Sequence, residues 1–330
     1  GLGTDPLETH IVLEELGWGS VDFAIGIGVS CFPAFFATMV PNDKLAEEII
    51  EPFCENKDAS LVGCWAITEP EHGSDTLCPF TPQFSDPTIS GQLTARLDGD
   101  EYVIEGQKSA WVSNGTVATH ALCYLTIDPS RGMDGGGICI VPLDLPGVRK
   151  GRPLDKIGQR ALNQGEIYFD KVRVPKEYML IDPESYSAML DITLSTANAA
   201  MGAMFVGVAR AAYEEALAYA KQRVQGGKVL FEHQLIKHKL FSMFTRIEAA
   251  RALSRAAMIY NYNKTPPKVE YSIASKVYCT QTAYEVTSEA IQVFGGNGLA
   301  REYPVEKFFR DARAGMIEDG ANDSLMLTGA

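Results

Sequence analysis

Three segments of the chain place hydroxyl, carboxylate, aromatic and glycine residues at spacings that could serve binding chemistry. In the first, the apolar stretch Trp65–Thr68 runs into Glu69-Pro70 and then Gly73-Ser74. Hydroxyls and free backbone N–H groups beside an aromatic side chain suit a flat group whose edges carry hydrogen-bonding atoms. By itself the string is more typical of a strand that ends in a tight turn, so its weight depends on the other two segments.

The second and third segments supply such partners. In Gly106–Gly115, Trp111 stands two residues before Ser113, so a ring could stack on an aromatic group while a hydroxyl donates to its heteroatoms. In Gln292–Gly298, glycines would let the backbone approach a pyrophosphate closely. Each segment also has an ordinary alternative, a core tryptophan in a β layer for the second and a helix C-cap for the third.

Composition excludes several classes of site. The 330-residue chain has 29 Lys and Arg against 42 Asp and Glu, a net charge of -13, which argues against nucleic-acid binding. Its seven cysteines form no CxxC pair, and its five histidines show no HExxH or HxxxH spacing. We therefore expect no metal site and no disulfide framework, with reduced thiols in a cytoplasmic compartment. A few arginines or backbone N–H groups could still hold a phosphate.

The spacing of apolar residues divides the chain into three regions that would position these segments. The first region, up to about Lys57, has helical periodicity. The second alternates like strands and contains a hairpin turn at Asp98-Gly99-Asp100. From Ser185 onward long amphipathic helices are separated by short breaks, as in an antiparallel bundle. The predicted fold class is α+β, with an N-terminal helical domain (1–60), a central β domain (61–180) and a C-terminal helical bundle (181–330).

The apolar runs do not predict a membrane span or a signal peptide. Phe23–Val40 comes closest, but Gly26, Gly28 and a proline interrupt it, so a helix that turns into a loop is expected. The chain opens at Gly1 without Met, within sequence typical of a helix entry, so we expect further residues in front of it.

In this order and spacing, the three segments resemble the acyl-CoA dehydrogenase family. The resemblance extends through Phe169–Pro175 and Arg223–Gln234, and so covers nearly the whole chain. It implies an N-terminal helical domain, a central β domain and a C-terminal four-helix bundle, assembled as a homotetramer. It also implies FAD between the β domain and the bundle, an acyl-CoA substrate, and electron-transfer flavoprotein as the partner that receives the electrons.

The resemblance also assigns roles to residues. The flavin ring would be lined by one group of side chains and the ADP half of FAD by another, part of it from a neighbouring subunit. Ser74 would lie near the phosphopantetheine of the substrate, and Gly320 would belong to the substrate-binding turn. The FAD-binding positions are Trp65, Ile67, Thr68, Ser74, Trp111 and Ser113 for the flavin; Arg223, Gln225, His233 and Gln234 for the ADP half; and Gln292, Gly295 and Gly296 from the neighbour.

The main departure from the family concerns the base that removes the α-proton of the thioester. The family usually has Glu before the glycine of its last motif, whereas this chain has Asp319 before Gly320. Some relatives carry the base on an earlier bundle helix, where this chain has Ala197 followed by Asn198. Asp319 is therefore the predicted base, in preference to its neighbour Glu318. The alternative is that both acids are solvated charges in a loop, or caps at the start of a helix.

An aspartate base resembles the alicyclic branch of the family, which dehydrogenates cyclohexane- or cyclohexene-carboxyl-CoA. Gly26 and Gly28 are consistent with a wider acyl pocket, although helix packing is the preferred explanation of them. Asp22 is a candidate second catalytic carboxylate for a remote ring proton, and its alternative is an exposed acid at a helix start. A non-catalytic flavoprotein of the same fold and an acyl-CoA oxidase remain alternatives. The expected location is the bacterial cytoplasm, or the mitochondrial matrix in a eukaryote.

Overall fold

The computed structural model describes residues 5–330, which form two compact units. Unit 1 comprises the chain up to Ala24, Lys156–Arg160 and Asp191–Ala330, and unit 2 comprises Ile25–Asp155 and Ala161–Leu190. Both helix and sheet are present, and the predicted α+β fold class is confirmed. The division at residues 60 and 180 into three domains stays a prediction.

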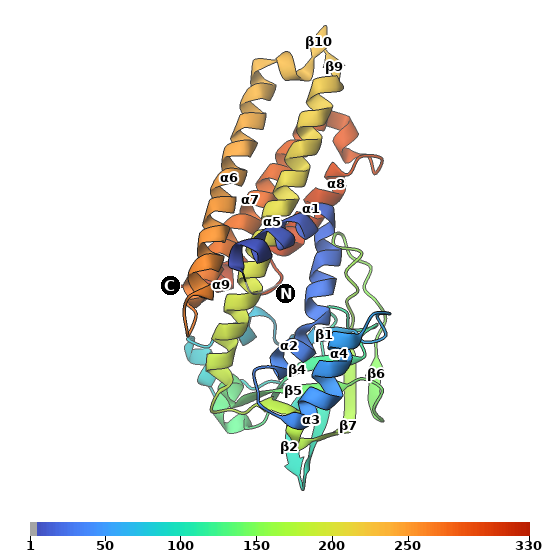
Figure 1. Cartoon of the computed structure of the whole chain (residues 1–330), viewed down its shortest axis with the longest axis vertical. Helices are drawn as coiled ribbons and strands as arrows, with labels where there is room; N and C mark the ends of the chain where they lie inside the picture. The colour runs from blue at the N-terminus through green and yellow to red at the C-terminus, as the bar shows by residue number, and fades with distance from the viewer. Residues whose placement is uncertain (1–4) are drawn as a thin grey trace. The chain divides into compact units, whose positions relative to one another are not determined.

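Unit 2 is built on an eight-stranded mixed sheet (Figure 1). Its strands follow the order β6-β7-β3-β2-β4-β5-β8, and β1 pairs in parallel with β4. The strands are β1 (Gly63–Ala66), β2 (Thr94–Asp98), β3 (Glu101–Lys108), β4 (His120–Thr126), β5 (Gly136–Pro142), β6 (Val148–Lys150), β7 (Ile167–Pro175) and β8 (Met179–Ile181).

The predicted hairpin is present between β2 and β3. Asp98 pairs with Glu101, and Gly99 between them has φ +70°, a conformation that glycine adopts without strain. Strands β4 and β5 are buried along nearly their whole length. The short apolar stretches around 167–169 and 172–175 are one strand, β7, because a bulge with Lys171 at φ +51° keeps its pairing with β3 continuous.

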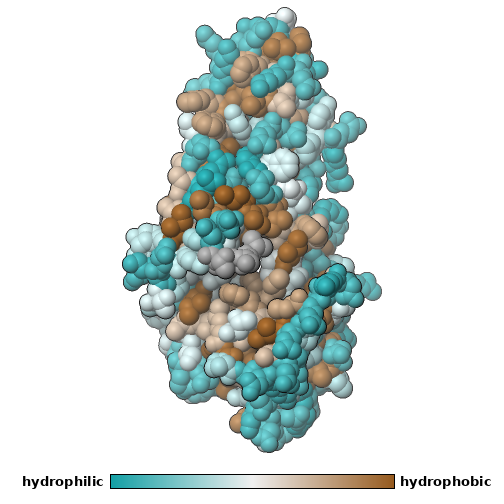
Figure 2. Space-filling view, viewed as in Figure 1, coloured by the Kyte–Doolittle hydropathy of each residue, from teal (hydrophilic) through white to brown (hydrophobic). Residues whose placement is uncertain are grey.

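Short helices complete unit 2. Asn42 caps α3 by accepting a hydrogen bond from the backbone N–H of Leu45 at 3.2 Å, which explains the helix start there. In the view of Figure 2, hydrophilic side chains gather over α4 and over the turn end of β2. The elements are α2 (Phe32–Ala37), α3 (Asp43–Leu45), a π-helical turn (Ala46–Ile50), α4 (Glu51–Glu55) and 3₁₀ turns at Ser74–Leu77, Pro82–Ser85, Pro129–Gly135 and Lys176–Tyr178.

Unit 1 contains the helical bundle. Helix α6 packs on α7, and α7 packs on α8 and α9. The break at Gly226-Gly227 is a two-residue hairpin turn, with both glycines at positive φ, between β9 and β10. The elements are α5 (Tyr186–Gln222), β9 (Val224–Gln225), β10 (Lys228–Val229), a 3₁₀ turn (Leu230–Glu232), α6 (Gln234–Tyr262), α7 (Val269–Phe294), a 3₁₀ turn (Gly295–Leu299), α8 (Val305–Gly315) and α9 (Asn322–Thr328).

Helix α1 (Pro6–Ser30) is two helices joined at a kink, because Ser20 has extended backbone angles of φ -169° and ψ 102°. Its first part is tied to the bundle by buried polar contacts. Glu14, 2% exposed, meets Arg210 of α5 at 3.1 Å and Arg251 of α6 at 3.1 Å. His10, fully buried, meets the Ser254 hydroxyl at 2.7 Å.

Two stretches, Pro6–Ala37 and Tyr186–Gln222, are long and apolar enough to cross a membrane by length and composition alone. A core helix of a soluble protein passes the same test, and the most apolar window of Tyr186–Gln222 is 83% buried inside the protein. That degree of burial fits a core helix. The absence of a membrane span stays a prediction.

Candidate active site

The first two sequence segments lie together in unit 2. Trp65 and Ser113 form a β-bridge, and the backbone N–H of Ser109 donates to the Thr68 carbonyl at 2.9 Å. Ser113 forms a second bridge with Gln164, whose side-chain amide donates to the Ser113 hydroxyl at 3.3 Å. The backbone therefore brings together residues that are more than forty positions apart in the sequence, as the resemblance implies.

The side chains of these segments differ in accessibility. Trp65 is buried against Phe32 and Tyr124, and its indole N–H has no hydrogen-bond partner within residues 5–330. Trp111, by contrast, is 57% exposed, which leaves a large aromatic surface free to stack. Ile67 is buried, and Thr68 is half-buried with no partner for its hydroxyl among the described side chains. Thr68 and Trp111 are thus the groups available to a ligand of unit 2.

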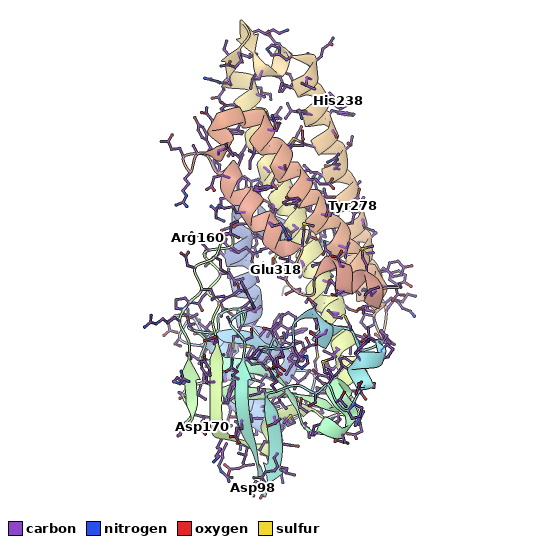
Figure 3. All side chains as sticks on the ribbon, turned by 180° about the vertical axis from the view of Figure 1, so that it is seen from behind. Asp98, Arg160, Asp170, His238, Tyr278 and Glu318 are labelled. Carbon is purple, nitrogen blue, oxygen red and sulfur yellow. The ribbon has the colours of Figure 1, made fainter. Side chains whose placement is uncertain are left out.

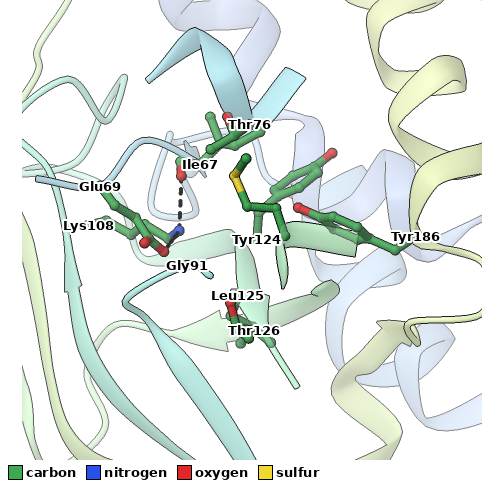
Figure 4. Close-up of a pocket in the computed structure, with 10 residues that line it drawn as sticks. Ile67, Glu69, Thr76, Gly91, Lys108, Tyr124, Leu125, Thr126 and Tyr186 are labelled. Carbon is green, nitrogen blue, oxygen red and sulfur yellow. Dashed lines mark hydrogen bonds and ion pairs between the residues drawn. The ribbon is translucent and has the colours of Figure 1, made fainter. Parts of the chain in front are cut away.

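A buried ion pair that the sequence analysis did not predict holds this region (Figure 4). The Lys108 ammonium donates to the Glu69 carboxylate at 2.7 Å and to the Ile67 carbonyl at 2.9 Å. Glu69 also accepts from the backbone N–H groups of Gln92 and Leu93. A cavity of about 20 Å³ beside the pair has room for about one water molecule. The pair therefore fixes the turn that follows Thr68, and the cavity is too small for a cofactor.

Ser74 opens the 3₁₀ turn Ser74–Leu77 at the end of the first segment and is half-buried. The Asp75 carboxylate stabilises this turn, because it accepts from the Gly73 backbone N–H at 2.6 Å and contacts the His72 ring at 2.7 Å. The His72 ring also contacts the Ser90 carbonyl at 3.2 Å, so the turn is held both by its own residues and by the segment before β2.

The third segment and the Arg223 segment are brought to the same end of the bundle in unit 1. Tyr219, near the end of α5, stacks on Phe294 with ring centres 4.0 Å apart, and its hydroxyl accepts from the Asn297 amide at 2.9 Å. Gly295 has φ +61°, and a Cβ at Gly295 or Gly296 would meet no atom within 4 Å. This end of the bundle thus offers an open glycine turn.

The hairpin at this end carries the other predicted ADP-binding positions. His233 contacts the Gln225 carbonyl at 2.9 Å, which ties the start of α6 to β9. Arg223 is exposed, and no carboxylate in residues 5–330 pairs with its guanidinium. Gln225, Gln234 and Gln292 are exposed as well. An unpaired guanidinium with exposed amides suits a phosphate-bearing ligand.

The predicted base lies in unit 1, in a turn between α8 and α9. Asp319 has φ +52°, which is uncommon for a residue other than glycine, and Gly320 follows at φ +93°. Two buried side chains hold the turn, because Asn198 of α5 donates to the Asp319 carbonyl at 3.4 Å and Lys276 of α7 donates to the Gly320 carbonyl at 2.7 Å. A Cβ at Gly320 would lie 2.7 Å from Leu325, so the turn requires glycine.

The two acids of the turn have different surroundings. Removal from water raises the pKa of Asp319 to about 6, and Lys276 opposes that rise. Removal from water also raises the pKa of Glu318 to about 8, and the nearby Asp319 charge adds to the rise. Glu318, labelled in Figure 3, accepts a hydrogen bond from the Gln159 amide. Both acids are half-buried, so neither is a fully solvated charge.

Asp22 is fully buried, so its alternative interpretation as an exposed acid is wrong. It does lie just after the kink of α1, where Ser20 donates to its carboxylate at 2.5 Å and Lys307 of α8 lies 3.2 Å away. Lys307 also pairs with the buried Asp311 at 2.5 Å. The sequence missed this salt-bridged cluster because an isolated Asp at a helix start does not reveal a partner far along the chain.

Three further positions from the sequence analysis are Gly26 and Gly28 in unit 2 and Ala197 in unit 1. In unit 2, the Gly26 carbonyl accepts from Asn114 at 2.9 Å, and a Cβ at Gly26 would touch Asn114 and Leu162. A Cβ at Gly28 would meet nothing within 4 Å. In unit 1, Ala197 is buried and carries no acid or base, which leaves Asp319 as the candidate.

Residues 5–330 hold no cluster of three or more His, Cys, Asp or Glu side chains that could bind a metal ion. The residues present do fit FAD. Unit 2 offers an exposed indole and a free hydroxyl beside a partnerless buried indole N–H, and unit 1 offers an unpaired arginine and an open glycine turn. These are the donors that a flavin ring and a pyrophosphate require.

Comparison with known proteins agrees with this chemistry. Residues 64–172 match the middle domain of acyl-CoA dehydrogenase, and residues 189–330 match its C-terminal domain. The chain is 34% identical to cyclohexane-1-carbonyl-CoA dehydrogenase of Geobacter metallireducens, over 84% of this chain and 69% of that protein. It is 30% identical to the mitochondrial short-chain specific acyl-CoA dehydrogenase of Bos taurus, over 98% of this chain and 74% of that protein.

A solved structure gives the same answer at the level of the fold. Butyryl-CoA dehydrogenase from Megasphaera elsdenii superimposes with a TM-score of 0.88 at 30% identity, covering 98% of this chain and 81% of that one. The matched domains, the sequence identities and the fold all point to the same family. The chain belongs to the acyl-CoA dehydrogenase family, whose members are FAD-dependent oxidoreductases.

Proposed function

We propose that this protein is an FAD-dependent acyl-CoA dehydrogenase in which Asp319 removes the α-proton of an alicyclic acyl thioester. The observation that carries the proposal is the turn at Asp319. Side chains from α5 and α7 bind its backbone, which is left-handed, and the Asp319 side chain is half-buried. Because its pKa is raised to about 6, this carboxylate is ionised at neutral pH and still basic enough to take a proton.

FAD, when bound, supplies the acceptor for the hydride that leaves the β-carbon. Thr68, Trp111 and Ser113 would hold the flavin ring, with Trp65, Ile67 and Ser74 forming its surroundings. The ADP half would meet Arg223, Gln225, His233 and Gln234, together with Gln292, Gly295 and Gly296 of a second copy in a homotetramer. The proton stays with this chain, on a carboxylate oxygen of Asp319.

The substrate class follows from the size of the base. Aspartate is shorter than glutamate by one carbon–carbon bond, about 1.5 Å. A wider substrate whose α-carbon belongs to a ring would compensate for that reach. The 34% identity to a protein named cyclohexane-1-carbonyl-CoA dehydrogenase supports the same class. Asp22 is kept as a second candidate acid for a ring proton, although Lys307 and Ser20 already occupy its carboxylate.

The test is anaerobic flavin bleaching by a panel of acyl-CoAs. We expect cyclohexane- or cyclohexene-carboxyl-CoA to bleach the flavin faster than butyryl- or octanoyl-CoA. Faster bleaching by a straight chain would exclude the alicyclic substrate, and no bleaching by any thioester would leave a non-catalytic flavoprotein. We also expect turnover to need electron-transfer flavoprotein or an artificial mediator, so oxygen consumption without one would indicate an oxidase.

The cellular setting follows from the relatives. They include bacterial and mitochondrial proteins, so we propose the bacterial cytoplasm or, in a eukaryote, the mitochondrial matrix. Fractionation of the source cells, followed by detection of the full chain, tests this location.

A further inference from the structure

Helix α7 carries a fully buried lysine that feels the charges of two acids, Asp319 and Glu318, in the turn before α9. Lys276 has an exposed fraction of 0%. Its ammonium donates to the Gly320 carbonyl at 2.7 Å and to the Asn322 side-chain oxygen at 2.9 Å. Asn322 is held in turn by the Thr280 hydroxyl, one helical turn along α7. A buried ammonium is costly unless it is paired, so its retention here needs a reason.

Both hydrogen-bond partners of Lys276 lie just after Asp319, the proposed base. Gly320 directly follows Asp319, and Asn322 is the first residue of α9. On the other side, Asn198 of α5 holds the Asp319 carbonyl. The left-handed angles at Asp319 and Gly320 are therefore maintained by side chains of two bundle helices. Without them the turn would relax toward the more common right-handed conformations.

The charges around the turn define what Lys276 does to Asp319. Asp319 is faced by Lys276 from α7 and by Glu318 from its own turn. Glu318 is faced in addition by Lys156 and Gln159 from the segment Lys156–Arg160. Asn198 of α5 carries no charge. Lys276 is thus the one cation among residues 5–330 that acts on the Asp319 carboxylate.

We propose that Lys276 is a positioning residue for the reaction, one that fixes the turn carrying Asp319 and keeps its carboxylate charged when substrate arrives. This inference rests on the proposed role of Asp319 as the base. Burial lowers the pKa of Lys276 to about 8, while the charge of Asp319 opposes that change, so the ammonium is charged at neutral pH.

Replacing Lys276 by an uncharged residue should change the pKa of Asp319 in a predictable direction. Loss of the cation removes an attraction for the Asp319 carboxylate, so the pKa of Asp319 rises, by about one unit for the loss of one opposite charge. At pH 6 the ionised fraction would then fall about fivefold, and at pH 9 it would be unchanged. The loss of rate is therefore largest in acid and is recovered in base.

The experiment uses the FAD-loaded protein with Lys276→Met and with Lys276→Gln, whose amide can still donate one hydrogen bond if the first variant folds poorly. The measurement is the pH dependence of anaerobic flavin reduction by the best acyl-CoA. A readout without substrate is hydrogen–deuterium exchange of the peptide 316–325, expected to quicken about tenfold once a buried hydrogen bond is lost. Lys276→Arg, which keeps the charge, should restore the acid limb of the profile.

Thr280→Val is the matched control, because it alters the same buried patch without changing a charge. It should leave the acid limb in place. An unmoved acid limb in both uncharged Lys276 variants, with Asp319→Asn inactive, would overturn the positioning role and leave the base assignment intact. Normal reduction by Asp319→Asn would instead remove the base assignment, and the role of Lys276 with it.

Discussion

At the scale of the residue, Asp319 and Glu318 are neighbours in sequence that have different surroundings. Glu318 is bound by Gln159, and the rise in its pKa to about 8 keeps it protonated at neutral pH. A protonated neighbour spares Asp319 the repulsion of a second charge. Asp319 would then be the acid that reacts, and Glu318 the one that stays neutral, as in other pairs whose surroundings separate their pKa values.

Substitution of each acid tests this division. Asp319→Asn should slow anaerobic flavin reduction by the best acyl-CoA about 10²–10⁴-fold, the usual contribution of a positioned base, while FAD stays bound. Glu318→Gln is the matched control, with an expected change of less than threefold at neutral pH because a neutral group replaces a neutral group. The reverse order would assign the base to Glu318, and two near-normal variants would direct attention to Asp22.

A second residue-scale prediction concerns His10 and acid stability. Burial, followed by the charges of Arg255 and Arg251, lowers the pKa of His10 from 6.5 to about 4. The unfolded chain therefore binds a proton more readily, and stability is lost as the pH falls from about 6.5 to about 4. The loss amounts to about 3 kcal/mol. Urea unfolding of the wild type and of His10→Gln at pH 7.5 and 4.5 should show the smaller decrease in the variant. Equal decreases would contradict the prediction.

At the scale of the element, one carboxylate holds the first part of α1 on the bundle. Glu14 is nearly inaccessible and meets Arg210, Arg251 and Arg255 from α5 and α6. Its neighbour Glu15 pairs with the same Arg210 at 2.7 Å, but the Glu15 side chain is 56% exposed. Adjacent acids on one helix therefore form a buried and a solvated ion pair.

This contrast predicts unequal losses of stability. Glu14→Gln should lower the free energy of unfolding by about 1–3 kcal/mol, because three partly buried guanidinium groups lose a buried charged acceptor. Glu15→Gln should lower it by less than about 1 kcal/mol, since water screens an exposed pair. Urea unfolding followed by circular dichroism compares the two variants directly. Losses of similar size would mean that Glu14 is not the anchor of α1.

The elements themselves could be predicted because their signals are local. The hairpin at Gly99 and the start of α3 at Asn42 follow from turn and capping residues that stand beside the elements they shape. The site could be predicted only where a motif carried it. Lys276 and Gln159 act on residues 44 and 159 positions away, and no local pattern specifies such pairings. A lysine among the apolar positions of α7 was the one signal that could have indicated Lys276.

At the scale of the whole molecule, we expect FAD binding to depend on assembly. Arg223 and the Gly295-Gly296 turn lie at one end of the bundle and are open to a ligand shared between copies. Figure 2 shows hydrophobic side chains among hydrophilic ones near the β9–β10 end of the bundle. Leu235 and Phe241 of α6 are each 66% exposed, as expected for a surface that another copy covers.

Arg223→Ala tests this dependence. The variant should release FAD about tenfold faster on dilution, because a charged phosphate contact is lost, while its helical content stays intact. Lys221→Ala removes a nearby exposed charge of the same sign and is the control. Flavin fluorescence after dilution gives the release rate, and size-exclusion chromatography gives the assembly. Unchanged release from an intact Arg223→Ala assembly would show that the assigned ADP contacts are wrong.

Unit 1 is assembled from stretches that lie far apart in the chain, and this affects when it can fold during synthesis. His10 meets Ser254, 244 positions later in the chain. On a ribosome that adds about 5–20 residues per second, the first part of α1 waits roughly 10–50 s for α6. Throughout that interval His10, fully buried in the finished fold, faces water or a chaperone. The β2–β3 hairpin can close as soon as it emerges, whereas unit 1 stays open until translation has passed most of the bundle.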